Sequence, residues 1–119
     1  MKVFSRLHIM IFSAMMSCSL SSVCNAQLVA EARDGSCHLT VEGQGQVFEV
    51  HVAGLKPGES LNVVSVSDGE SLTSSPNARQ DGSYGVTLFP AVEGKALGRV
   101  TLSVKSSRCR LKVTFPWQS

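Results

Sequence analysis

Five basic residues near the C-terminus are the strongest candidate binding site in this chain of 119 residues. Residues 98–119 contain no acidic residue, and their cations are Arg99, Lys105, Arg108, Arg110 and Lys112. From residue 108 to residue 115, polar and apolar side chains alternate, which is typical of a strand with one face in water. Arginine and lysine bind carboxylate and phosphate groups, and the planar guanidinium can do so through two parallel hydrogen bonds. We therefore expect these residues to point outward from one hairpin and to contact an anionic partner: an acidic glycan, a lipid head group or an acidic protein.

The charge distribution leaves a second interpretation open. Residues 27–97 carry nine acidic and four basic residues, a net charge of −5, so neighbouring strands could neutralise the cations. Cations also protect sheet edges against pairing with other chains. Nucleic acid is a poor candidate for the partner, because no aromatic side chains alternate with the cations to stack on bases.

Two histidines have the chemistry of metal ligands. His38 and His51 fall on the polar sides of two neighbouring expected strands, with Glu42 or Glu49 as a third ligand. A transition-metal site needs three or four ligands in fixed geometry. Solvent-facing histidines on a polar sheet face are commoner, so we expect no metal here.

The polar segment 67–82 is the longest stretch without a clear strand pattern. Asp68, Glu70 and Asp81 offer oxygen ligands for calcium, but their spacing does not match the EF-hand loop. Long loops are often binding elements. We predict a surface loop with a short edge strand around Leu72.

No arrangement of catalytic residues stands out. The chain lacks a Gly-x-Ser-x-Gly sequence and a Cys-x-x-Cys sequence, and its carboxylates are not paired in a recognisable frame. We therefore expect a protein that is not an enzyme and that carries no cofactor.

The first 26 residues have the order of a secretory signal peptide. Lys2 and Arg6 precede an apolar run of about 15 residues, shorter than a transmembrane helix, and small residues precede Gln27. We predict cleavage after Ala26 and a single domain over residues 27–119, in the periplasm or secreted. A lipid anchor on Cys24 or Cys18 is the alternative.

Export would leave two cysteines, Cys37 and Cys109, which we expect to form a disulfide in an oxidising compartment. Both fall on the apolar side of an expected strand, so the bond should run through the core. It would join an early strand to the last one.

The segments between these residues predict an all-β fold. Period-two patterns recur over residues 37–42, 47–53, 61–67, 83–90, 99–105 and 108–115, and residues 27–33 form a less certain edge strand. Turn residues separate them, with Pro57 and Gly58 at the centre of a type II turn. Six or seven short strands at this spacing predict a β-sandwich.

The apolar pattern also predicts a strand register. In the first hairpin we expect Val41 opposite Phe48, Cys37 opposite Val52 and His38 opposite His51. In the last hairpin we expect a two-residue turn, Val104 opposite Cys109 and Lys105 opposite Arg108.

Three aromatic residues are candidates for the core. Phe48 and Tyr84 fall on the inward side of their strands. Trp117 either closes one end of the sandwich or is exposed as a stacking group.

This plan resembles the immunoglobulin-like or fibronectin-type sandwich, although no tryptophan lies between the cysteines as in antibody domains. The stretch "VVSVSDGESL" is also similar to a strand and turn of the small periplasmic curli-assembly factor, which is immunoglobulin-like. In that family the stretch closes the chain, whereas here it is central, and that family's closely spaced cysteine pair is missing.

These observations favour an exported accessory module that acts by binding an anionic partner through the C-terminal hairpin. The alternative is a subunit or chaperone-like assembly factor of a surface filament, which would act by strand addition at residues 27–33.

Overall fold

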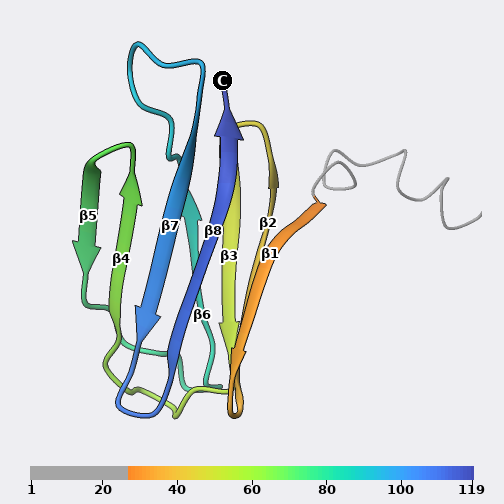
Figure 1. Cartoon of the computed structure of the whole chain (residues 1–119). Coiled ribbons are helices and arrows are strands. Elements are labelled where there is room, and N and C mark those ends of the chain that lie inside the picture. Colours follow the sequence, from red (N-terminus) through yellow and green to blue (C-terminus); the bar gives the residue numbers. More distant parts are fainter. Residues whose placement is uncertain (1–26) are drawn as a thin grey trace, which may run out of the picture.

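The computed structural model describes residues 27–119 as eight β-strands in two antiparallel sheets (Figure 1). The strands are β1 (Gln27–Asp34), β2 (Cys37–Gln44), β3 (Val47–Ala53), β4 (Asn62–Ser67), β5 (Glu70–Ser74), β6 (Tyr84–Leu88), β7 (Leu97–Lys105) and β8 (Arg110–Gln118). One sheet has the order β1-β2-β3-β6 and the other β5-β4-β7-β8. The predicted leader lies outside the described residues. Within the described part, no helix is long and apolar enough to cross a membrane.

The predicted all-β sandwich is confirmed, with eight strands where six or seven were expected. The expected edge strand at residues 27–33 is β1, and the one around Leu72 is β5. Pro57 and Gly58 form the expected turn: Gly58 has φ 75°, and the Glu59 N–H donates to the Lys56 carbonyl at 3.1 Å.

The core lies between the sheets, where every second residue of the central strands is buried. In β3, β7 and β8 buried and accessible residues alternate strictly over most of each strand. The Phe48 and Phe115 rings, from opposite sheets, pack with centroids 4.8 Å apart. Tyr84 is only half-buried, because it lies on β6 at the edge of its sheet.

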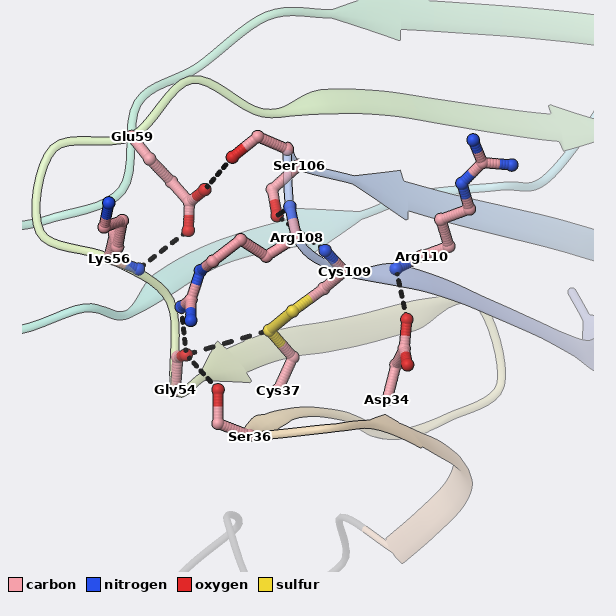
Figure 2. The surroundings of a disulfide bond; sticks show 11 residues. Asp34, Ser36, Cys37, Gly54, Lys56, Glu59, Ser106, Arg108, Cys109 and Arg110 are labelled. Atoms are coloured by element: carbon pink, nitrogen blue, oxygen red, sulfur yellow. Dashed lines mark hydrogen bonds between the residues drawn. A yellow bond between two sulfur atoms is a disulfide. The ribbon is translucent and has the colours of Figure 1, made fainter.

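A disulfide joins Cys37, the first residue of β2, to Cys109, just before β8. Both cysteines are buried, and they are separated by 72 positions in the sequence. The predicted pairing is therefore confirmed. The bond lies at one end of the sandwich rather than within the last strand (Figure 2).

The predicted register of the first hairpin is wrong by two residues. Val50 lies opposite Val41 and Phe48 opposite Gly43, so the inward side of each strand is as expected but the pairs are shifted. Only Gly45 and Gln46 separate the two strands, and Gly45 has φ 70°, which suits a tight turn. Gly43 remains in β2 because its missing side chain makes room for the Phe48 ring, 2.7 Å from the position a Cβ would take.

The predicted register of the last hairpin is also wrong by two residues. Leu111 lies opposite Val104, and Lys105 faces Arg110 rather than Arg108. The turn has four residues because Ser106 stabilises it: its hydroxyl accepts the N–H groups of Arg108 and Cys109 at 3.2 and 3.0 Å. The Ser106 N–H also donates to the Cys109 carbonyl at 2.8 Å.

Trp117 closes the core at the other end of the sandwich, as one of the two alternatives predicted. It is 2% exposed, and its Nε1–H donates to the Ser67 hydroxyl at 3.0 Å. That hydroxyl donates in turn to the Pro90 carbonyl at 2.7 Å. The indole ring lies flat over Gly98, directly across the ladder, where a Cβ would come within 2.7 Å of the ring.

Candidate anion-binding face

Three of the five predicted cations gather on the outer face of the second sheet. Lys105 ends β7 and Arg110 begins β8, so the two lie directly opposite each other across the turn. Lys112 follows two residues along β8 and therefore points to the same side. All three are exposed, and their neighbours Val104 and Leu111 are buried. We call Lys105, Arg110 and Lys112 the cationic face.

The strands beside the cationic face bring no acid to it. Residues opposite each other in a ladder share a face of the sheet. By this pairing β4 contributes Asn62, Val64 and Val66, and β5 contributes Ser71 and Thr73. Within residues 27–119 two ion pairs are present, His38–Glu31 and Lys95–Asp68, and neither includes these cations.

One carboxylate approaches the cationic face from the other sheet. Asp34, the last residue of β1, accepts the backbone N–H of Arg110 at 2.7 Å. Figure 2 shows the Arg110 side chain pointing away from this carboxylate, so the guanidinium remains open to solvent. Asp34 therefore fixes the start of β8 without forming an ion pair with the arginine side chain.

Arg108 lies apart from the cationic face. It is in the turn, and its guanidinium donates to the Gly54 carbonyl at 3.3 Å, beside the disulfide (Figure 2). The same carbonyl accepts the Ser36 hydroxyl at 3.0 Å. Arg108 thus fastens the β7–β8 turn to the end of β3 rather than extending the row of cations.

Glu59 lies next to Arg108 and is held as a carboxylate. Its pKa is lowered chiefly by the hydrogen bond that it accepts from the Lys56 N–H, at 2.7 Å. Burial opposes this and raises the pKa, while hydrogen bonds from Ser106 and Ser107 and the charge of Arg108 each lower it by a smaller amount. Arg108 is therefore partly neutralised, unlike the cations of the outer face.

Arg99 is the fifth predicted cation and lies at the far end of the same outer face. It is opposite Pro116 and six residues along β7 from Lys105. At about 3.3 Å per residue this places it roughly 20 Å away. The five cations therefore do not form one continuous ribbon.

The two histidines do not face each other as expected. His51 is opposite Thr40, and His38 is opposite Ala53 because of the two-residue shift in register. The His38 Nε2 instead lies 2.8 Å from a Glu31 carboxylate oxygen on β1. No group of three potential metal ligands is present among residues 27–119.

The three acids considered as calcium ligands have separate surroundings. Asp68 pairs with Lys95 at 2.9 Å, and Glu70 begins the edge strand β5. Asp81 accepts the hydroxyl and the N–H of Ser83 at 2.6 and 3.0 Å. These two hydrogen bonds are the main reason that the pKa of Asp81 is lowered.

Comparison with known proteins supports the fold and goes no further. No protein-family model matches the chain, and no curated protein matches it. Among solved structures, it is similar to a DUF3244 family protein from Bacteroides vulgatus with an immunoglobulin-like β-sandwich fold, with a TM-score of 0.52 and 15% sequence identity. The match covers 78% of this chain and 99% of that one. The chain therefore has an immunoglobulin-like sandwich, whereas the likeness to the curli-assembly factor stays a prediction.

The sequence reasoning missed an open apolar edge. Leu72 on β5 and Phe89 after β6 are 75% and 70% exposed, and they line one shallow hollow. Leu72 was expected on a short edge strand within a surface loop, and nothing in its sequence surroundings marked it as a contact residue. The available signal was a leucine and a phenylalanine in otherwise polar surroundings, but only the sheet order brings them together.

Proposed function

We propose that this protein is an exported, non-catalytic binding module that holds an anionic partner on the cationic face. The observation that carries the proposal is a set of three exposed cations on a sheet face where the neighbouring strands of the same sheet contribute no acid. Like charges directly opposite each other, as Lys105 and Arg110 are, destabilise a sheet. A bound anion would remove that repulsion.

An acidic glycan fits this face better than the other anions considered. The same outer face also carries the hydroxyl groups of Thr101, Ser103 and Thr114, of which Ser103 lies opposite Lys112. The hydroxyl oxygens of Thr101 and Thr114 are 3.2 Å apart across the ladder. A polar, flat surface of hydroxyls and cations can bind both the carboxylate and the hydroxyl groups of a sugar chain. Arg110 supplies the planar donor that matches a carboxylate or sulfate.

The disulfide supports export as part of the same proposal. Such bonds persist in oxidising compartments such as the periplasm, and this one is buried at both ends. We propose cleavage after Ala26 and a location in the periplasm or at the cell surface. N-terminal sequencing of the protein purified from its own cells tests the cleavage; a chain beginning at Met1 would contradict it.

The binding test uses heparin and alginate as sulfated and carboxylated probes. We expect affinity to fall steeply as salt is raised, because exposed charges are screened within about 8 Å at physiological ionic strength. The Arg110→Gln, Lys112→Gln variant should lose most of the affinity. Arg99→Gln, a change of charge of the same kind at the far end of the face, should retain it.

Two further probes separate the possible partners. Vesicles with anionic head groups test lipid, and polyglutamate tests an acidic protein. Binding of vesicles alone would assign the face to a membrane surface. No binding of any probe at low salt, or equal binding by the double variant, would refute the proposal.

A further inference from the structure

The two edges of the sandwich differ in how well they are closed. At one edge, β8 is tied to the other sheet: the Arg110 N–H donates to Asp34, and the Gln118 N–H donates to the Gly45 carbonyl at 3.0 Å. At the other edge, all five residues of β5 are exposed. Figure 1 draws β5 beyond β4, with no strand of the other sheet behind it. This edge is open.

Leu72 faces the inside of the sandwich at the open edge yet remains exposed. It lies opposite Ser65, and the residues on the same face of β4, Val63 and Ser67, are buried. Leu72 therefore projects from the face of the sheet that elsewhere packs on the core. Its 75% exposure means that the first sheet does not cover this part of β5, although the Tyr84 side chain on β6 reaches Ser74 at the end of β5.

The first sheet ends at β6, whose outer edge is unprotected. β6 pairs with β3 in an unbroken register over Tyr84–Leu88. No backbone hydrogen bond from the described turns and loops reaches these residues, so half of the β6 backbone groups face outward without a backbone partner among residues 27–119. The strand YGVTL contains no charge, no proline and no bulge.

The other edge strands carry the protections that β6 lacks. β1 has a bulge between Leu28 and Ala30 and charged side chains at Glu31 and Arg33. On β8, the N–H groups of Arg110 and Gln118 point away from β7, toward the free edge. Every second residue of a strand directs its N–H to the same side, so residue 116 would also direct one there. Because residue 116 is proline, that edge has one donor fewer for another chain. The N-terminal edge, where strand addition was first considered, is thus less suited to it than β6.

A hollow beside the end of β6 has the size of one short aliphatic side chain. Its volume is about 70 Å³, and it is lined by Leu72, Leu88, Phe89 and Pro90 together with Ser65, Ser67, Glu70 and Ala91. Glu70 is exposed at its rim and forms no ion pair within residues 27–119. The hollow therefore combines an apolar wall with one unpaired carboxylate.

We propose that the open edge accepts one extended segment of a partner polypeptide, which pairs with β6 and lies beneath β5. Main-chain hydrogen bonds would provide affinity and the hollow would provide selectivity, as in other cases of strand addition. The segment should be uncharged at its centre, with apolar residues at alternate positions, one of them in the hollow. A lysine or arginine of the segment next to the residue in the hollow would form an ion pair with Glu70.

A second folded copy of this chain does not fit the same place. Pairing of β6 with β6 of another copy would bring that copy's own second sheet into the space that β5 occupies. A single strand has no second layer and avoids this conflict. The occupant is therefore an extended segment rather than another sandwich.

The test uses a synthetic peptide of alternating valine and threonine that ends in lysine. Bound peptide should slow amide hydrogen exchange in Tyr84–Leu88 by about tenfold or more, because new ladder hydrogen bonds form there. Leu72→Ser should weaken binding at least about fivefold. Leu97→Ser is the matched control, since Leu97 is 68% exposed on the outer face of β7, and it should bind as the unaltered protein does.

Four outcomes would overturn the proposal. They are protection confined to β1 or β8, equal binding by a peptide with proline at its centre, equal loss in Leu97→Ser, and no binding at all. Association of the protein with itself that is lost in Leu72→Ser would identify a second copy as the occupant instead. Leu72→Ser should leave heparin binding unchanged, so failure here is separate from failure of the cationic face.

Discussion

Replacing Ser67 by alanine should destabilise the fold strongly, because one hydroxyl connects three elements inside it. Ser67 is 7% exposed; its oxygen accepts from Trp117 Nε1 on β8, and its hydrogen is donated to the Pro90 carbonyl between β6 and β7. Ser67→Ala leaves a buried donor and a buried acceptor without partners. Each such group costs about 1–3 kcal/mol, so the loss should be about 2–4 kcal/mol, allowing for partial hydration.

Urea unfolding followed by the far-ultraviolet circular dichroism of the β-sheets measures this loss, and the signal remains when Trp117, the only tryptophan of the chain, is replaced. With a slope of about 1–2 kcal/mol per molar urea for a chain of this size, the midpoint should fall by roughly 1–4 M. Ser71→Ala, an exposed serine on the adjacent strand, is the matched control and should change little. Trp117→Phe combined with Ser67→Ala should cost less than the sum of the two changes, because both remove the same hydrogen bond. A loss below about 0.5 kcal/mol for Ser67→Ala, or strict additivity, would refute the reasoning.

Removing the disulfide with Cys37→Ala and Cys109→Ala should lower the free energy of unfolding by about 4 kcal/mol, because the bond closes a loop of 72 positions in the unfolded chain. Urea unfolding measures this loss, and a change under about 1 kcal/mol would contradict the prediction. Gly98→Ala should lower the melting temperature by several degrees, because a Cβ there meets the Trp117 ring; an unchanged value would show that the ring moves freely. The lowered pKa of Glu59 means that its carboxylate adds stability at neutral pH and loses this effect as pH falls below 4.5. Glu59→Gln should therefore be less stable than the unaltered protein at pH 7, and the difference should shrink as the pH falls below 4.5; a difference that stays the same down to the lowest pH at which the protein remains folded would count against this role.

The sequence predicted which face of a sheet each side chain lies on, but not which residue lies opposite it on the neighbouring strand. Alternation of apolar residues fixed the inward positions of Val41, Val50 and Leu111, since exposing them would cost burial of apolar surface. Sliding a strand by two residues preserves that alternation, so it distinguished poorly between registers. The turns decided the register instead, through the φ of Gly45 and the hydroxyl of Ser106.

The same limit explains why the predicted cations divided into groups. Arg108 and Arg110 have the same parity, and only the four-residue turn removes Arg108 from the strand and lets it donate to Gly54. Conversely, the disulfide could be predicted because the expected removal of residues 1–26 would leave only Cys37 and Cys109. The open edge at Leu72 could not, because it depends on how far β6, the next strand along the chain but part of the other sheet, extends beneath β5.

The two proposed contacts should act independently, because the sheet order separates them. In the order β5-β4-β7-β8, the cationic face lies over β7 and β8 on the outside, whereas Leu72 lies on β5 and faces inward. β5 and β8 are three strand spacings apart, roughly 14 Å at about 4.8 Å per spacing. The buried side chains of Val63 and Leu102 lie on the inner face of the strands between them, opposite to the cationic face. Exposed charges at that distance are largely screened at physiological salt. A segment held at β6 should therefore leave glycan affinity unchanged, and the protein could join a polyanion to a polypeptide, which neither contact alone would achieve.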